Sequence, residues 1–239
     1  MTNQTQLSPS IRRSEDRGHA NHGWLESYHS FSFANYQDPA HQQFRHLRVI
    51  NEDWIAPGQG FGMHPHRSME IFTYVVSGQL RHEDSMGNAR TIQAGEFQYM
   101  SAGEGVMHSE FNASDTEPVH LLQIWIIPEQ AGGEPNYADI DLSAEFADGK
   151  LTRLASPNGA NGSIAMRQKA DIQFGRLAAG QSLTSAERPG QTHQWLQLIK
   201  GSLKIGDSQL NRGDALSITH GDLEIEATSD AEFLIFQLS

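Results

Sequence analysis

Hydrophobic and polar residues alternate along most of this chain in short runs that are rich in β-branched and aromatic residues. Glycine, asparagine, aspartate and proline separate the runs, and helical periodicity is sparse. Short runs bounded by turn residues are typical of all-β sandwiches or barrels rather than of βαβ units. The pattern predicts strands within residues 44–55, 70–84, 95–100, 106–113, 119–128, 164–177, 193–206, 214–218, 223–229 and 231–238.

Two segments rich in turn residues, 129–146 and 155–163, divide the pattern into two parts that look like copies of one unit. Gly78 and Gly201 each end one strand, and Gly95 and Gly213 each precede an acidic residue that opens another. A chain of 239 residues can bury two cores. We therefore predict an N-terminal domain over residues 1–134, a linker over 135–160 and a C-terminal domain over 161–239.

Composition narrows the classes of function. The net charge of −12 argues against nucleic-acid binding, which needs clustered lysine and arginine, although it leaves a protein partner open. No apolar run approaches the ~20 residues that span a bilayer, and the N-terminus lacks the apolar segment of a secretion signal. We expect a cytoplasmic protein without membrane contact. The chain has no cysteine, so any metal must be bound by histidine, aspartate or glutamate.

Two short segments place histidines and glutamates in strand-like spacing. Because side chains alternate between the two faces of a strand, His64, His66 and Glu70 share one face if this segment is extended. By the same argument His108 and Glu110 share one face. If the two segments lie on neighbouring strands, three imidazoles and one or two carboxylates converge. Such a set suits a divalent Fe, Mn, Ni, Cu or Zn ion and leaves positions open for water or substrate.

A single histidine in a strand is more often a surface or hydrogen-bonded group than a metal ligand, so the combination carries the prediction. Gly58-x5-His64-x-His66-x3-Glu70-x7-Gly78 resembles the first cupin motif, and Gly95-x7-Gly103-x4-His108-x3-Asn112 resembles the second. The stretches HPHRSMEI, SGQLRHEDSMGN and MSAGEGVMHSEFN are similar to the pirin family, in particular to its bacterial members with quercetin 2,3-dioxygenase activity. The resemblance implies a bicupin fold, with two β-barrel (double-stranded β-helix) domains in one chain.

Within pirin-like proteins the resemblance implies that the fourth metal ligand is Glu110 rather than Glu70. His64, His66, His108 and Glu110 are thus the expected ligands, and Glu70 becomes a candidate for orienting a ligand imidazole, or for a salt bridge at the rim. The C-terminal copy shows no such set, because alignment on its glycines places other residues at the ligand positions: Glu187, Pro189, His193, Glu226 and Thr228. We expect a C-terminal barrel without metal.

The resemblance implies that the protein cleaves a flavonol such as quercetin with O2 and releases carbon monoxide and a depside. Glu110 would then act as the base that takes the substrate's hydroxyl proton. The resemblance favours Fe as the metal, with Cu, Mn, Ni, Co or Zn as alternatives. Apolar candidates for lining the site are Met63, Phe72, Tyr74, Phe97, Met100, Met107, Phe111, Leu122 and Trp125. Two other hypotheses stay open: a metal-binding regulatory or interaction protein with incidental dioxygenase activity, and an isomerase or storage-like cupin.

Overall fold

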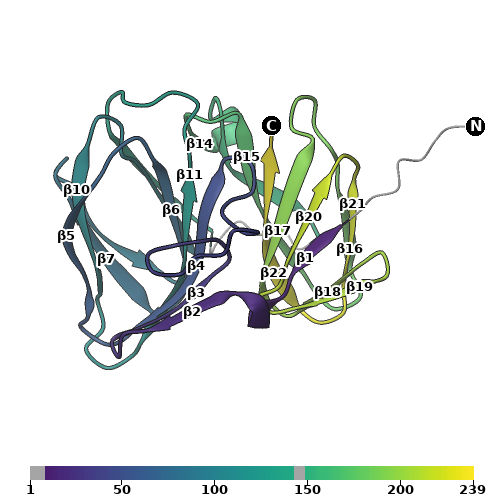
Figure 1. Cartoon of the computed structure of the whole chain (residues 1–239), viewed down its shortest axis with the longest axis horizontal. Coiled ribbons are helices and arrows are strands. Elements are labelled where there is room, and N and C mark those ends of the chain that lie inside the picture. Colours follow the sequence, from purple (N-terminus) through teal and green to yellow (C-terminus); the bar gives the residue numbers. More distant parts are fainter. Residues whose placement is uncertain (1–8, 143–148) are drawn as a thin grey trace, which may run out of the picture. The chain divides into compact units, whose positions relative to one another are not determined.

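The computed structural model of the protein describes residues 9–142 and 149–239, and their regular secondary structure is almost entirely β-strand (Figure 1). Two short 3-10 helices, η1 (Ser14–Asp16) and η2 (Ala160–Gly162), interrupt them. The described residues form two compact units. The first unit starts at Arg17, runs through the first described range and includes Met166–Gln168; the remaining residues form the second. The all-β, bicupin prediction is confirmed.

The first unit is built from two antiparallel sheets. The order in the larger sheet is β12 (Asn136–Asp141), β9 (Glu96–Ser101), β6 (Glu70–Ser77), β11 (Val119–Ile126), β4 (Leu47–Ile55), β3 (Leu25–His29) and β2 (Gly18–Asn21). The order in the smaller sheet is β5 (Gly60–His66), β10 (Val106–Asn112), β7 (Gln79–Asp84) and β8 (Ala89–Gln93). One cluster of buried apolar side chains joins both sheets and includes Leu80 and Leu121. The two sheets therefore enclose a common interior.

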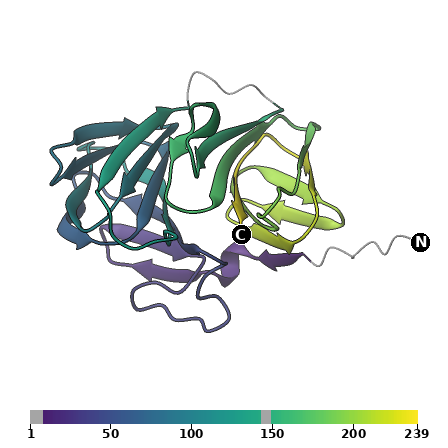
Figure 2. The same cartoon turned by 90° about the horizontal axis from the view of Figure 1, so that it is seen from above.

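The second unit repeats this arrangement, as Figure 2 shows from above in green to yellow. The order in its larger sheet is β1 (Ser10–Arg12), β20 (Ala215–Thr219), β17 (His193–Lys200), β22 (Ala231–Leu238), β15 (Ala170–Leu177), β13 (Leu151–Ser156) and β14 (Ile164–Ala165). Its smaller sheet contains β16 (Ser182–Ser185), β21 (Leu223–Ala227), β18 (Ser202–Ile205) and β19 (Ser208–Asn211). The matching strand orders bear out the two copies, and Gly78 and Gly201 occupy the same turn with φ angles of 79° and 76°.

The predicted domain boundaries need correction at both ends of the first part. β1 pairs with β20, so residues 10–12 belong to the second unit rather than to an N-terminal domain of residues 1–134. The predicted linker, 135–160, contains β12, which pairs with β9, and β13, which pairs with β15; its residues 143–148 lie outside the described residues. β1 and β12 are short, partly exposed edge strands. Such strands carry a weak hydrophobic pattern, and the sequence therefore did not reveal them.

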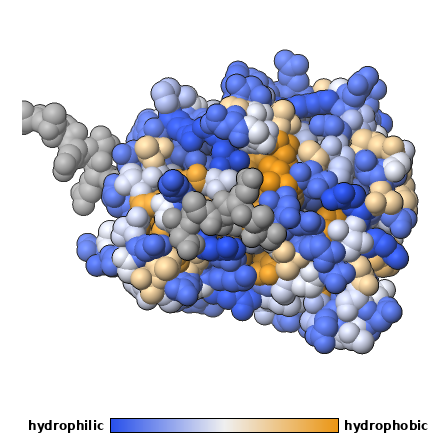
Figure 3. Space-filling view, turned by 180° about the vertical axis from the view of Figure 1, so that it is seen from behind, coloured by the Kyte–Doolittle hydropathy of each residue, from blue (hydrophilic) through white to orange (hydrophobic). Residues whose placement is uncertain are grey.

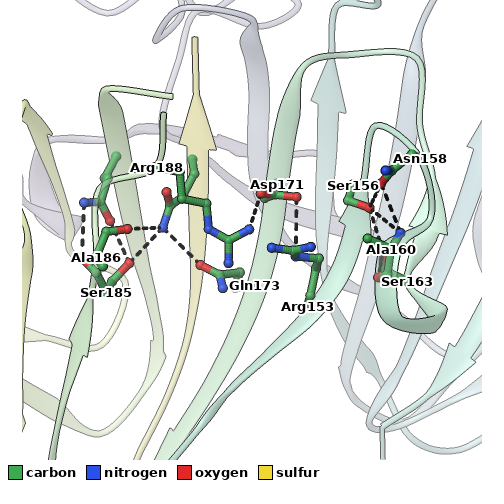
Figure 4. A network of polar contacts seen from close by, with 12 residues as sticks. Arg153, Ser156, Asn158, Ala160, Ser163, Asp171, Gln173, Ser185, Ala186 and Arg188 are labelled. Atoms are coloured by element: carbon green, nitrogen blue, oxygen red, sulfur yellow. Dashed lines mark hydrogen bonds and ion pairs between the residues drawn. The ribbon is translucent and has the colours of Figure 1, made fainter. Parts of the chain in front are cut away.

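Hydrogen bonds and ion pairs connect buried polar side chains of the second unit, as Figure 4 shows. Asp171 is paired with Arg188 and, at 3.5 Å, with Arg153. The amide of Gln237 donates to the Ser185 hydroxyl at 3.2 Å. These contacts hold polar side chains of separate strands in place without a ligand.

The surface is predominantly hydrophilic on the face that Figure 3 shows, with smaller apolar areas. Among the described residues, the exposed large hydrophobic side chains are Met63, Met86 and Met107. No helix in the described ranges is long and apolar enough to cross a bilayer.

A buried ion pair in the first unit predicts a pH-dependent stability. Glu52 on β4 lies 2.9 Å from the Arg17 guanidinium and 3.0 Å from Nε2 of His120. Burial by itself raises the pKa of Glu52, but the hydrogen bond from His120 and the charge of Arg17 outweigh burial and lower the pKa to about 2. A glutamate in the unfolded chain has a pKa of about 4.3. Glu52 therefore stabilises the fold above that pH, and the stability is lost as the pH falls towards 2.

We expect Glu52→Gln to lower the free energy of unfolding by about 3 kcal/mol at neutral pH, and to have a smaller effect at each lower pH in this window. Urea unfolding of both proteins at a series of pH values measures the difference. A difference that stays constant down to the lowest pH would show that the Glu52 carboxylate does not carry this stability.

Candidate metal centre

The predicted ligand segments are neighbouring strands of the smaller sheet in the first unit. β5 and β10 pair antiparallel, and His64 lies directly opposite His108. The register then shifts by one residue, so Glu110 pairs with Phe61. Gly60 makes this close approach possible, because a Cβ atom there would lie 2.2 Å from the backbone oxygen of Glu110. The glycine-rich sequence before the histidines thus sets the position of the glutamate.

The structure brings the three predicted imidazoles together. One ring nitrogen each of His64, His66 and His108 lies within 4.8 Å of the others. The Nε2 atoms of His64 and His108 are 3.1 Å apart, and Nδ1 of His64 is 2.8 Å from the carbonyl oxygen of Gly62. A proton on that Nδ1 leaves the Nε2 lone pair of His64 directed at the cluster.

Burial and the neighbouring rings keep the imidazoles of His66 and His108 neutral. Desolvation, followed by the effect of His108 and His64, lowers the pKa of His66 to about 4. Desolvation, followed by the effect of His64 and His82, lowers the pKa of His108 to about 3. Neutral imidazole is the form that binds a metal, so the donor set fits a divalent transition-metal ion at neutral pH.

Glu110 is buried next to the imidazoles and is held by two side chains. The Gln123 amide donates a hydrogen bond to its Oε2 at 2.9 Å, and the Thr73 hydroxyl donates to its Oε1 at 3.3 Å. Burial raises the pKa of Glu110, and the nearby His82 and His64 partly offset this rise. A carboxylate held by two donors and made more basic by burial can accept a proton from a bound hydroxyl group.

His82 is a site residue that the sequence argument missed, because it has no ligand partner at a recognisable spacing. It pairs across the strands with Glu110, and a ring nitrogen lies within 4.8 Å of potential ligand atoms of His108 and Glu110. Both of its nitrogens have partners, Asp84 at 3.0 Å and the Gln98 amide at 3.3 Å. The alternation of His82 and Asp84 with exposed residues was the available signal.

Glu70 does not orient a ligand imidazole, and it does not form a salt bridge at the rim. It is 1 % exposed and accepts hydrogen bonds from the Tyr99 hydroxyl at 2.5 Å, the Ser101 hydroxyl at 2.7 Å and the backbone N–H of Arg167 at 2.9 Å. Two of these three donors, Tyr99 and Ser101, lie on β9, so the Glu70 carboxylate is directed towards that strand. Glu70 therefore anchors the segment around Arg167 to the first unit.

A cavity of about 700 Å³ opens beside the cluster and includes His64, His66, Glu110 and Gln123 among its lining residues. Its apolar wall is largely aromatic, formed by Trp24, Leu25, Phe33, Tyr36, Phe61 and Trp125. Of the nine side chains predicted to line the site, Trp125 alone borders this cavity. Met63 and Met107 are exposed. Where a strand is buried on both faces, the sequence does not show which side chains point into the barrel and which point to its covered outer face. The predicted set therefore contains residues of both faces.

The strand register corrects the residues predicted as equivalents in the second unit. Leu80 on β7 pairs with Asn112, and Leu203 at the matching place on β18 pairs with Ala227. Counting back along the partner strand, Leu223 and Ile225 correspond to His108 and Glu110, in place of the predicted Glu226 and Thr228. Both side chains belong to the apolar core of the second unit and offer no atom to a metal.

Two β-barrels of matching topology, one carrying a histidine and glutamate cluster on adjacent strands, define a bicupin metalloprotein. The chain matches the family model "Pirin" over residues 10–126 and "Quercetinase C-terminal cupin domain" over residues 153–238. It is 47 % identical over 230 residues to quercetin 2,3-dioxygenase of Escherichia coli K12, covering 95 % of this chain and 97 % of that protein.

Two solved structures from E. coli agree closely with this chain. The YhhW structure has a TM-score of 0.92, with 43 % identity over 97 % of both chains. The structure of bacterial pirin YhhW in complex with nickel(II) has a TM-score of 0.91, with 43 % identity over 96 % of this chain and 98 % of that chain. The protein belongs to the pirin family.

Proposed function

We propose that the protein is a metal-dependent dioxygenase that cleaves a flavonol such as quercetin with O2 and releases carbon monoxide and a depside. The observation that carries the proposal is the cluster of His64, His66 and His108. It lies beside the buried Glu110, and His64, His66 and Glu110 line a cavity with aromatic walls. The extensive identity to the E. coli quercetin 2,3-dioxygenase supports it.

The residues that hold the metal are His64, His66, His108 and Glu110. The nickel(II) complex of the E. coli pirin supports a divalent ion. Fe is the proposed physiological metal, and Ni, Cu, Mn, Co and Zn are the alternatives that analysis must distinguish. When bound, the metal supplies Lewis-acid stabilisation of the substrate's anion and the electron transfer that allows O2 to react.

The protein side chains bind the substrate and move its proton. Trp24, Phe61 and Trp125 form flat apolar surfaces that hold a planar aromatic substrate and exclude water. Glu110 takes the proton of the substrate hydroxyl, while Gln123 and Thr73 fix the orientation of its carboxylate.

The proposed substrates are a small aromatic molecule and O2, and the proposed compartment is the cytoplasm. A chain without cysteine is compatible with that compartment. A cavity of about 700 Å³ falls within the usual range for small-molecule sites.

The proposal is tested by metal analysis of protein purified without added metal, followed by oxygen uptake with quercetin. We expect one transition-metal ion per chain and one molecule of carbon monoxide released per O2 consumed. Protein treated with a chelator serves as the matched control, and re-addition of single metals identifies the active one. A metal-loaded protein that binds quercetin without consuming O2 would refute the enzyme and favour a metal-binding interaction protein.

A further inference from the structure

We propose that Asp53 and Ser27 form a subsite that binds a peripheral hydroxyl group of the substrate, distinct from the hydroxyl that reacts. This subsite makes the cavity selective for neutral, hydroxylated aromatic molecules. The inference rests on the proposed function, because it concerns how the same cavity recognises its substrate.

The strand register places this subsite next to the reaction centre. Ser27 on β3 lies directly opposite Asp53 on β4, and Asn51 on β4 lies opposite Gln123 on β11. All four side chains line the cavity, and Gln123 also holds Glu110. Asp53 is two residues from Asn51, a distance of about 7 Å along a strand. Asp53 therefore lies farther along the sheet than Gln123, by a distance that an aromatic ring with its hydroxyl group can span.

One acceptor atom in this subsite, Oδ2 of Asp53, has no hydrogen-bond donor among the described residues. The Ser27 hydroxyl donates to Oδ1 of Asp53, and Nδ1 of His29 is 2.8 Å from Oδ1 of Asn51. Among the described residues none donates a hydrogen bond to Oδ2 of Asp53, whose side chain lines the cavity although the residue is only 4 % exposed. Oδ2 is therefore open to the cavity, where a substrate hydroxyl can form a hydrogen bond with it.

The charges around Asp53 select the kind of group that binds. Burial, together with the negative charges of Glu110 and Glu52, raises the pKa of Asp53 to about 7, although the hydrogen bond from Ser27 opposes the rise. Its carboxyl group can therefore accept or donate a hydrogen bond near neutral pH. A ligand carboxylate at this place would meet the carboxyl group of Asp53, which is partly ionised near neutral pH, and be repelled. A hydroxyl group pairs with either form.

The fold itself does not require an acid at this place. In the second unit Gly175 pairs with Phe233 as Asp53 pairs with Leu121. A Cβ atom at Gly175 would lie 2.3 Å from the Phe233 ring, so the ring covers the position that Asp53 occupies in the first unit. The second barrel is filled with apolar side chains here, whereas the first keeps a cavity with a carboxyl group in its wall.

The test compares two ligands in the metal-loaded protein. Quercetin carries several hydroxyl groups, whereas 3-hydroxyflavone carries only the reacting one. Binding is followed by tryptophan fluorescence, since Trp24 and Trp125 line the cavity, and turnover by oxygen uptake. We expect Asp53→Ala to weaken quercetin binding and raise the KM for quercetin roughly 10-fold, while 3-hydroxyflavone binds and reacts as it does in the wild-type protein. Asp53→Asn, which keeps an acceptor oxygen, should recover part of the quercetin affinity.

Glu83→Gln is the control, because Glu83 is an exposed acid of the same unit that pairs with Arg81 and does not line the cavity. It should not alter the preference for quercetin. An equal loss for both ligands in Asp53→Ala, or no loss for either, would overturn the subsite, as would wild-type protein that binds neither flavonol. If wild-type protein binds both ligands without consuming O2, the dioxygenase proposal fails while the binding comparison still decides the subsite.

Discussion

His108→Ala is expected to remove the metal ion and, with it, oxygen uptake in the presence of quercetin. His108 is buried and belongs to both groups of potential ligands, with His64 and His66 on one side and His82 and Glu110 on the other. Loss of a side chain that only supports a ligand typically costs 10–100-fold in metal affinity or activity, so we expect loss of the ligand itself to cost more than about 100-fold. Metal content after purification and oxygen uptake measure both effects.

His41→Ala provides the control for this change, because His41 pairs with Asp38 in the same unit and does not line the cavity. It should retain metal and activity. Added divalent metal should raise the thermal midpoint of the wild-type protein and of His41→Ala, but not that of His108→Ala, because a ligand stabilises only a state that binds it. Full metal content in a folded His108→Ala protein would contradict the assignment of this ligand.

The strands and the duplication were predictable because they depend on local sequence. A glycine with a φ angle near 80° is required where one strand turns back on the next, and both Gly78 and Gly201 stand at such turns. Each is followed by an alternating strand with its buried face inward, Gln79–Asp84 in one unit and Ser202–Ile205 in the other. The pattern therefore predicted the strands and their repetition without any long-range information, and the resemblance to the cupin motifs supplied the two barrels.

The convergence of the histidines was also predictable, because strand alternation puts His64 and His66 on one face. The remaining parts of the site depend on which strands pair, and in which register. His82 reaches Glu110 only because β7 pairs with β10, and Glu70 turns to Tyr99 and Ser101 because β6 pairs with β9. Sequence spacing carries no record of such pairings.

The same limit applies to the wall of the cavity and to the predicted equivalents of the ligands in the second unit. Trp24, Phe33 and Tyr36 precede residues 44–55, the first segment predicted as a strand, and nothing in the sequence marked them as cavity residues. In the second unit, alignment on Gly213 predicted Glu226 at the place of His108, whereas the register puts Leu223 there. The turn between the strands has a different length in the two units, so an alignment on one glycine cannot fix both strands that follow it.

Glu110→Gln is expected to separate the two roles assigned to this residue, ligand and base. Glutamine keeps the shape of the side chain and can still accept a hydrogen bond from the Gln123 amide, but it cannot take a proton. General-base catalysis typically contributes ~10²–10⁴-fold, so kcat with quercetin should fall by that range in protein saturated with metal. Gln123→Leu, which removes the 2.9 Å hydrogen bond to Oε2 but leaves the carboxylate itself in place, should have a smaller effect.

Metal content decides between the two roles, because the three imidazoles remain in Glu110→Gln. If Glu110 acts as the base, the variant should stay slow when enough metal is added to fill the site. If Glu110 acts only as a ligand, excess metal should restore kcat to the wild-type value, and the assignment of the base would then be wrong. Burial makes the first result the expected one: it raises the pKa of Glu110, which increases the proton affinity of a carboxylate placed beside the bound hydroxyl.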